Sequence, residues 1–465
     1  MIPMTLAEVA DVVGGALVHA DPVSTVSGPV EYDSRRVGPG GLFAAFAGAN
    51  VDGHDFAEAA YAAGAVAVLG TRAASGPSVV VADPLEALAA LARAVVDRLP
   101  ALTVVGITGS SGKTSTKDLI AQLLARLGPT IAPAGSLNNE LGLPHTVLRA
   151  DAQTRFLVLE MGARGSGHIR YLCGIAPPTV GVVLNVGVAH IGEFGSVEAI
   201  EAAKGELVQA LPARGVAVLN ADDERVWAMA GRTRAQVVGF GESPAASVRA
   251  VDIGLDGRGR PAFTLVADGA TVPVQLGLTG RHQVSNALAA AAVARTQGMA
   301  PTELGPALGD LRLVSTRRMD VFDRSDGVTV IDDSYNANPA SAAAALRALA
   351  ALGSGRRRIA VLGYLAELGA YERAGHEEVG RLAAELGVER IVVVGAGAGP
   401  IHDGATAVTE WGGESVQVSG QEEAVALLRT QLRPGDVVLV KGSRYRTWDV
   451  VDALRDGAGQ GEVTR

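Results

Sequence analysis

The sequence predicts an α/β protein of three domains, because short buried strands alternate with helices along a chain too long for one core. Apolar, β-branched segments at 102–107, 155–162, 179–187 and 215–222 each read as a buried strand, and helical stretches lie between some of them. A further set of such strands begins after residue 315. Strand alternating with helix is typical of a mainly parallel sheet covered on both faces. At about 150 residues per domain, 465 residues are enough for three domains.

The predicted domains are residues 1–100, 101–315 and 316–465. The first mixes short apolar runs, turn signals and an alanine-rich helical stretch, and is expected to be a small α/β domain. Its last helix should start at Asp83-Pro84, with proline in the first turn, and Pro100 marks the boundary. The central domain is expected to contain a P-loop-type, mainly parallel sheet with helices on both faces. The C-terminal domain is expected to be a Rossmann-like α/β unit, in which ligands bind beyond the carboxyl ends of the strands.

Composition excludes several classes of protein. With 40 Lys and Arg against 49 Asp and Glu, and no basic block, the chain lacks the charge pattern of a nucleic-acid-binding protein. The single cysteine, Cys173, excludes an intrachain disulfide and is compatible with a reducing cytoplasm. The N-terminus carries Glu8 and Asp11 where a signal peptide would be apolar, and the most apolar run, 177–192, is too short to cross a bilayer. We therefore expect a cytoplasmic protein with no membrane insertion.

A glycine-rich loop follows the strand at 102–107 and precedes an amphipathic helix. The stretch GITGSSGKTSTK at 106–117 departs from a strict Walker A motif, since Ile107 stands where the first glycine belongs. An incidental lysine in an ordinary turn is the alternative, but strand, loop and helix together favour phosphate binding by backbone N–H groups and the helix N-terminus. Lys113 would neutralise β- and γ-phosphate oxygens, and Thr114 would ligate Mg²⁺. The predicted phosphate-binding residues are Gly109, Ser110, Ser111, Gly112, Lys113, Thr114 and Ser115.

Several other polar residues have two readings when their own stretch is taken alone. Asn138 and Asn139 in GSLNNELGLP either bind a polar ligand or stiffen a turn. Glu160 ends a strand and is either a Mg²⁺ ligand or a solvated charge. His190 follows an apolar strand, where a cap or core histidine is commoner than a ligand. Lys204 lies among small residues and is either solvated or, if buried, a neutral amine that acts as a nucleophile or takes up CO₂.

A series of short motifs, taken in order, is similar to the Mur ligase family. The resemblance runs from DSRRV at 33–37 to KGSR at 441–444. The phosphate loop is shared across that superfamily, whereas YNANP and NNELGLP are typical of the members that join D-Ala-D-Ala to UDP-MurNAc-tripeptide. The motifs are TGSSGKTSTK, GSLNNELGLP, EMGARGSGHI, AHIGEFGS, AAKGEL, GRHQVSNALAA, DDSYNANP, AELG and VKGSR.

The resemblance implies a metal and nucleotide site. It implies ATP as substrate, two Mg²⁺ ions, and metal ligands at Thr114, Glu160, His190 and Lys204. Lys204 would be carbamylated, which turns a cation into a carboxylate-like ligand beside Mg²⁺. The catalytic residues implied are Lys113, His190, Lys204 and Arg318. On the nucleotide side the implied contacts are Asn286, Arg318, Asp333, Tyr335 and Asn336, while Gln283 stands where relatives often have Asn.

The resemblance also implies the rest of the substrate site. Ser34 and Arg35, with the DGH at 52–54, would hold the UDP end, since a guanidinium binds pyrophosphate through two hydrogen bonds. Tyr364 and Leu365 replace the Asp-Met pair that is commoner in the family, and no role is assigned to Tyr364. The implied substrate contacts are Ser34, Arg35, Asn138, Asn139, Asn338, Lys441, Ser443 and Arg444.

The implied reaction is ATP-driven amide-bond formation through an acyl phosphate, by a monomer. Three alternatives share parts of this pattern: a P-loop GTPase or kinase, a sister ligase such as a folylpolyglutamate synthase or another Mur enzyme, and a non-catalytic nucleotide-binding scaffold. The Asn-Lys-x-Asp motif that reads guanine is absent, the DSR, DGH and YNANP blocks favour the first assignment over a sister ligase, and a scaffold needs no metal ligands. The interpretation requires Glu160, His190 and Lys204 to lie within about 10 Å of Lys113.

Overall fold

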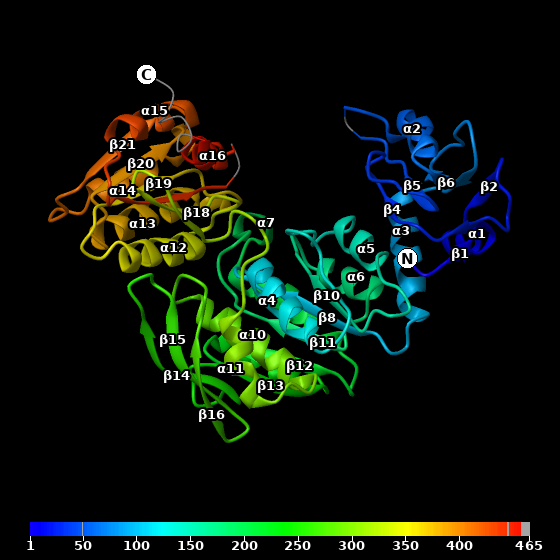
Figure 1. Ribbon diagram of the computed structural model, residues 1–465, viewed down its shortest axis with the longest axis horizontal. Coiled ribbons are helices and arrows are strands. Elements are labelled where there is room, and N and C mark those ends of the chain that lie inside the picture. The colour runs from blue at the N-terminus through cyan, green and yellow to red at the C-terminus, as the bar shows by residue number, and fades with distance from the viewer. Residues whose placement is uncertain (49, 444–445, 457–465) are drawn as a thin grey trace.

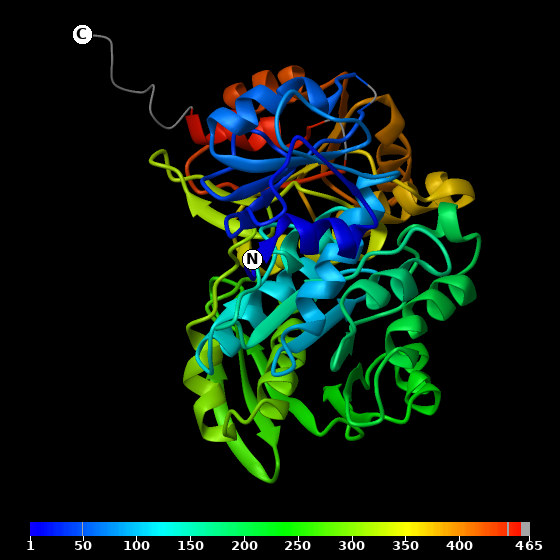
Figure 2. The ribbon, with the colours of Figure 1, turned by 90° about the vertical axis from the view of Figure 1, so that its right-hand side faces the viewer.

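The computed structural model describes residues 1–48, 50–443 and 446–456. Its α/β domains are arranged around a central one, with the N-terminal domain at the right of Figure 1 and the C-terminal domain at the upper left. Figure 2 shows the same arrangement from the side of the N-terminal domain. The predicted α/β class with three domains is confirmed. Among the helices of the described residues, none is both long and apolar enough to cross a membrane.

The N-terminal domain is built on a five-stranded sheet of order β2-β7-β6-β5-β4, beside the antiparallel pair β1-β3. Asp83 caps α3 by accepting hydrogen bonds from the Leu85 and Glu86 amides, so the helix start predicted at Asp83-Pro84 is confirmed. The strands are β1 (Met4–Thr5), β2 (Ala16–Val18), β3 (Thr25–Val26), β4 (Val30–Glu31), β5 (Gly41–Ala44), β6 (Ala65–Gly70) and β7 (Ser78–Val80). The helices are α1 (Leu6–Val13), α2 (Ala57–Ala62) and α3 (Pro84–Asp97).

The central domain contains a nine-stranded sheet of order β16-β15-β14-β13-β12-β11-β8-β10-β9. Every pair from β9 to β14 is parallel, and the two pairs that join β14, β15 and β16 are antiparallel. The strands are β8 (Thr103–Thr108), β9 (Thr130–Ile131), β10 (Phe156–Glu160), β11 (Val180–Val183), β12 (Val216–Asn220), β13 (Gln236–Gly241), β14 (Val248–Leu255), β15 (Pro261–Ala267) and β16 (Ala270–Gln275).

Helices cover both faces of this sheet, as the sequence predicts. Apolar residues of α4, α10 and α11 pack in one core with one face, and those of α5, α6 and α8 belong to the core on the other. The second core continues into the N-terminal domain through α1 and α3. The helices are α4 (Lys113–Ala125), α5 (Gly142–Val147), α6 (His168–Ile175), α7 (Ile191–Phe194), α8 (Val197–Gln209), α9 (Glu224–Ala228), α10 (Gln283–Thr296) and α11 (Pro301–Gly309).

The C-terminal domain contains a six-stranded sheet of order β17-β18-β22-β19-β20-β21, parallel except for β17. Helices α12, α13 and α14 pack on one face, and α15 and α16 on the other. The strands are β17 (Asp320–Asp323), β18 (Thr329–Asp333), β19 (Arg358–Leu362), β20 (Arg390–Val394), β21 (Glu414–Val418) and β22 (Val437–Lys441). The helices are α12 (Pro339–Leu352), α13 (Glu372–Glu385), α14 (Pro400–Thr406), α15 (Gln421–Gln431) and α16 (Trp448–Asp456).

Parallel pairing brings the carboxyl ends of the central strands to one edge. Glu160, the last residue of β10, pairs in register with Ile107 of β8, directly before the phosphate loop. Strand β11 lies on the other side of β8 and leads into the segment that contains Asn185 and His190. This edge therefore collects the polar ends of three neighbouring strands, which is where ligands bind in open α/β sheets.

Candidate active site

The phosphate loop is braced by the segment that follows β11. The Ser111 amide donates to Asn185 Oδ1 at 2.9 Å, and the Gly187 amide donates to Ser110 Oγ at 2.8 Å. Gly112 caps α4 in the left-handed region, at φ +81°, and a Cβ there would lie 2.8 Å from Asn286 Oδ1. Only glycine meets both conditions without strain, so the loop is held in one shape before any ligand binds.

Lys113 opens α4 and turns back over the loop. Its Nζ donates to the Gly109 carbonyl at 2.8 Å. Burial lowers the pKa of Lys113, which Glu160 and Glu367 partly oppose and Arg318 reinforces. A desolvated ammonium in this position needs an anionic partner, and phosphate oxygens are such a partner.

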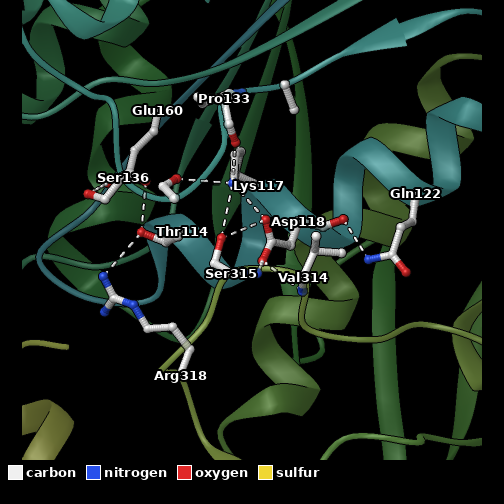
Figure 3. Close-up of polar contacts among 12 residues, drawn as sticks. Thr114, Lys117, Asp118, Gln122, Pro133, Ser136, Glu160, Val314, Ser315 and Arg318 are labelled. Atoms are coloured by element: carbon white, nitrogen blue, oxygen red, sulfur yellow. Dashed lines mark hydrogen bonds and ion pairs between the residues drawn. The ribbon is translucent and has the colours of Figure 1, made fainter. Parts of the chain in front are cut away.

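Glu160 is a buried carboxylate surrounded by donors at the floor of the cavity. Thr114 Oγ1 donates to Glu160 Oε2 at 2.8 Å, and Asn138 Nδ2 donates to Oε1 at 2.7 Å (Figure 3 labels Thr114, Glu160 and Ser136). Ser136 Oγ is 3.4 Å from the same Oε1. The described residues contain no cluster of three His, Cys, Asp or Glu side chains able to hold a metal ion. Hydroxyl and carboxylate oxygens nevertheless suit Mg²⁺, which usually takes one or two carboxylates and completes its shell with water and phosphate.

Lys204 lies in α8 and is buried, with a relative exposure of 5%. Its pKa is well below the ordinary lysine value, first because of burial and second because of the positive charge on Lys113. Within the described ranges, no carboxylate oxygen lies within 4.0 Å of its Nζ. The burial of Lys204 selects the buried reading over the solvated one, and it disfavours the charged form of the amine.

His190 is held by the C-terminal domain. It caps α7 with a left-handed backbone, at φ +63°, and its Nδ1 lies 2.5 Å from Glu367 Oε2. The Gly192 amide donates to the Glu367 carbonyl at 3.2 Å, so the same loop binds both residues. Glu367 was not among the expected site residues, although its AELG motif was noted. An acidic residue in the loop after β19 was the available signal.

Arg318 extends from the start of the C-terminal domain to the phosphate loop. Its guanidinium carbon lies 4.3 Å from the centre of the Tyr335 ring, and its Nη2 is 3.4 Å from Thr114 Oγ1 (Figure 3). Stacking on a tyrosine face orients the flat guanidinium without neutralising it. Arg318 therefore presents positive charge to the phosphate loop from a different domain.

One cavity of 940 Å³ gathers most of the predicted site residues. It is lined by residues of all three predicted domains. The predicted residues in its wall are Ser110, Ser111, Gly112, Lys113, Thr114, Ser115, Asn138, Asn139, Glu160, His190, Arg318, Tyr335, Asn336, Asn338 and Ser443.

The remaining predicted residues lie outside this wall. Gly109 accepts a hydrogen bond from Lys113 of the wall, and Lys204 lies near enough for the charge of Lys113 to lower its pKa. Asp333 and Lys441 form a buried ion pair with each other, and the pair also holds the Met319 amide through Asp333 and the Asn336 carbonyl through Lys441. The predicted substrate contact at Arg444 lies outside the described residues.

Asn286 and Gln283 form a buried pair behind the phosphate loop. Thr116 Oγ1 donates to Asn286 Oδ1 at 3.1 Å, and Asn286 Nδ2 donates to Gln283 Oε1 at 2.9 Å. Gln283 therefore orients the Asn286 amide.

Tyr364 contacts helix α13. Its hydroxyl donates to Glu372 at 2.5 Å, and its ring packs against His376.

The N-terminal residues Ser34 and Arg35 are absent from the cavity wall. Arg35 is exposed and pairs with Asp33 at 2.7 Å, and this hydrogen-bonded pair lowers the pKa of Asp33 to about 2. Asn139 and Asn338 line the cavity but also cap turns, because they accept hydrogen bonds from the Gly142 and Ser341 amides.

The chain matches the Mur ligase family over most of its length. Residues 29–104 match the model described as Mur ligase family, catalytic domain, residues 107–294 match the Mur ligase middle domain, and residues 317–444 match the Mur ligase, glutamate ligase domain. The chain belongs to the Mur ligase family.

Similar proteins share one name. The UDP-N-acetylmuramoyl-tripeptide–D-alanyl-D-alanine ligase of Mycobacterium tuberculosis is 50% identical, over 95% of this chain and 96% of the relative. The enzyme of that name from Escherichia coli is 35% identical, over 98% and 99%. Among solved structures, MurF from Acinetobacter baumannii has a TM-score of 0.87 at 31% identity, covering 98% and 99%. MurF from Thermotoga maritima in complex with ADP has a TM-score of 0.80 at 30% identity, covering 93% and 98%.

Replacing Gly192 with alanine is expected to lower kcat about tenfold or more, because it pushes the central and C-terminal domains apart. A Cβ on Gly192 would lie 2.6 Å from the Gly369 amide nitrogen, closer than real contacts allow. The shift would part His190 from Glu367 and Arg318 from Thr114. Steady-state kinetics check this, with Gly174→Ala as a control at an exposed helical position, where a Cβ meets no atom within 4 Å. Wild-type kcat in Gly192→Ala would show that this contact is dispensable.

Proposed function

We propose that this chain is an ATP-dependent ligase that joins D-alanyl-D-alanine to the carboxyl end of UDP-N-acetylmuramoyl-tripeptide, with release of ADP and phosphate. The observation that carries the proposal is the contact between Arg318 Nη2 and Thr114 Oγ1, 3.4 Å apart, at the phosphate loop. In the proposed complex, cationic groups from two domains, Lys113 and Arg318, would surround the terminal phosphate of ATP. The relatives whose names state this reaction are similar over nearly the whole chain.

In the first step of the reaction, two anions, the tripeptide carboxylate and ATP, must come together. The tripeptide carboxylate attacks the γ-phosphorus of ATP, the bond to ADP breaks, and an acyl phosphate forms. The amine of D-Ala-D-Ala then attacks the acyl carbon, and phosphate leaves as the amide forms. Lys113 and Arg318 offset the repulsion between carboxylate and triphosphate, and they are already in place before charge develops.

Mg²⁺ would be held by Thr114 and Glu160, with His190 and Lys204 as further candidates. When bound, it would neutralise phosphate charge and polarise the γ-phosphoryl group. Asn138 and Ser136 keep the Glu160 carboxylate in place through Oε1. In this structure His190 faces Glu367, so metal binding by His190 competes with that contact. We infer two ions, as in the resemblance described above.

Lys204 is proposed to be carbamylated. A buried neutral amine adds to CO₂ and releases one proton, leaving a carbamate with a negative charge. The positive charge of Lys113, which lowers the pKa of Lys204, would favour the carbamate for the same electrostatic reason. The modification would give the buried side chain a negatively charged oxygen ligand suited to Mg²⁺.

The acyl phosphate must be kept from water, and the C-terminal domain is placed to do so. Contacts of Gly192 with Gly369 and of His190 with Glu367 close the site on that side. We propose that the enzyme acts as a monomer. Because its substrates are ATP and a nucleotide-linked precursor, we place it in the cytoplasm.

The assignment is tested by supplying purified protein with ATP, MgCl₂, UDP-MurNAc-tripeptide and D-Ala-D-Ala, and measuring the product by mass spectrometry. The pentapeptide product is expected only when all components are present. Omission of either peptide substrate serves as the control, since a GTPase, kinase or scaffold would not depend on both. Equal product from D-alanine or from a UDP-MurNAc-dipeptide would instead favour a sister ligase.

A further inference from the structure

We propose that Lys117 and Asp118 are positioning residues for the ligation reaction. They form an ion pair on α4, one turn beyond the phosphate loop, with Nζ and Oδ1 2.6 Å apart and side chains 2% and 4% exposed. Through this ion pair, α4 holds two segments. One is the linker that leads to Arg318, and the other is the loop whose Ser136 contacts Glu160. The inference rests on the proposed function, because it concerns residues assigned to that reaction.

Asp118 binds the linker between the central and C-terminal domains. Its Oδ2 accepts hydrogen bonds from the Val314 amide at 3.2 Å and the Ser315 amide at 2.8 Å. Its Oδ1 accepts a third from Ser315 Oγ at 3.1 Å. Figure 3 shows these bonds between α4 and the segment that continues to Arg318. Two amides on one carboxylate fix the path of the backbone as well as its distance from the helix.

Lys117 binds the loop that precedes the predicted asparagine pair. Its Nζ donates to the Pro133 carbonyl at 2.7 Å and the Gly135 carbonyl at 3.1 Å, and lies 3.3 Å from Ser315 Oγ. Ser136 follows Gly135 and contacts Glu160 at 3.4 Å. The orientation of the Glu160 carboxylate is therefore linked to Lys117 through two adjacent residues (Figure 3).

The linker is also held from its far side, on either flank of Arg318. Arg317 donates to both carboxylate oxygens of Asp452, at 3.1 and 3.0 Å, and the Met319 amide donates to Asp333 Oδ1 at 3.2 Å. Arg317 and Met319 have left-handed backbones, at φ +60° and +51°. Residues without glycine's freedom adopt such conformations only when their surroundings impose them. Release of the Asp118 end would let this segment relax and move Arg318.

A structural role alone would not require this arrangement. A buried ion pair is weak evidence for stability, since well-packed apolar residues often serve as well. Here the ammonium and both carboxylate oxygens are bonded to two backbone segments that converge on the catalytic groups. A fully bonded buried network is rigid, and it is attached to the same helix whose N-terminus forms the phosphate site. The positions of Arg318 and Glu160 are thus set relative to that site.

The test compares Ser315→Ala and Asp118→Asn with Arg126→Gln in full-length protein, using the product assay above. Arg126, which caps the end of the same helix, is the control because its exposed ion pair at 2.7 Å is with Asp310, and in the described residues its side chain makes no hydrogen bond to residues 313–318. We expect kcat to fall about fivefold in Ser315→Ala, from loss of the hydrogen bonds that Ser315 Oγ makes with Asp118 and Lys117, and roughly 10- to 100-fold in Asp118→Asn. KM for ATP should stay within about twofold, and the control should match wild type.

A double-mutant cycle with Arg318→Ala separates positioning from simple loss of stability. If Ser315 and Asp118 act through Arg318, their substitution should cost much less in the Arg318→Ala background than in wild type. Equal losses in both backgrounds, or wild-type kcat in folded Ser315→Ala, would overturn the inference. If Asp118→Asn does not fold, Ser315→Ala decides alone.

Amide hydrogen exchange gives a readout that needs no turnover. The Val314 and Ser315 amides should exchange at least about tenfold faster in Asp118→Asn, or in Ser315→Ala if that is the only folded variant, and unchanged in Arg126→Gln. Unchanged exchange would overturn the inference even if the enzyme proves active. Absence of product from wild type would refute the proposed function instead, and the exchange comparison would still decide whether this pair fixes the linker.

Discussion

Replacing Lys204 with alanine is expected to lower product formation by about 10²- to 10³-fold, because a ligand to Mg²⁺ would be lost. Added acetate or formate should restore part of the activity, since a small carboxylate fits the space left by the side chain and carries the missing charge. Lys204 is buried, and its pKa is lowered by the charge of Lys113. Within the described ranges its amine has no carboxylate partner, so it is available to react with CO₂. Steady-state rates with and without the carboxylate measure both effects.

The carbamate itself can be observed without turnover. Wild-type protein in ¹³C-bicarbonate should give a carbamate carbon signal by NMR, and Lys204→Ala should lack it. Chloride at equal ionic strength is the control for the rescue, and Glu201→Gln is the control on the same helix, because Glu201 pairs with Arg225 and Arg232 on its outer side. Full activity in Lys204→Ala, or rescue by chloride as good as by acetate, would remove Lys204 from the mechanism.

Replacing Lys113 with methionine is expected to lower kcat by about 10³-fold while raising the thermal midpoint of the free protein at pH 7. The loss of rate follows from removing the charge that faces the triphosphate. The gain in stability follows from burial, which lowers the pKa of Lys113 in the native protein. Stopped assays of product and thermal unfolding of the same samples measure the two effects.

The lowered pKa of Lys113 also predicts how the stability of the protein changes with pH. Between the lowered native pKa of Lys113 and its ordinary value of 10.5, the unfolded chain binds a proton that the folded chain does not. The free energy of unfolding of wild type should therefore fall as pH decreases through that window, and the advantage of Lys113→Met should shrink toward pH 10.5. A methionine variant less stable than wild type at pH 7 would show that the ammonium stabilises the free protein. Arg126→Gln should show neither effect.

Most of the parallel architecture could be predicted from local sequence, but one edge of the central sheet could not. Strand β8, which precedes the phosphate loop, and strand β10, which ends at Glu160, are continuous apolar runs, typical of strands buried on both faces. Strands β14 to β16 are antiparallel instead and were not anticipated. The signal was present: 261–267 alternates buried and half-buried residues, and Asp268 and Gly269 turn with positive φ, as in a tight hairpin.

The candidate site divides in the same way. Lys113 and Thr114 could be identified from the loop between strand and helix, because phosphate binding there is a property of local backbone. The reading of Lys204 stayed open until the fold showed its burial. Glu367, Lys117 and Asp118 were missed because their partners are far away in the sequence. His190 and Glu367 are 177 positions apart. Asp118 accepts hydrogen bonds from residues 314 and 315.

The sequence by itself determined the class of fold, the phosphate loop and the family, because strand periodicity, helix starts and glycine-rich turns are set by residues close together in the chain. Only the tertiary structure decided which polar groups lose their water and which partners replace it. Burial and long-range pairing depend on how separate domains pack. They lowered the pKa of Lys204, turned His190 toward Glu367 and joined Asp118 to the linker of Arg318.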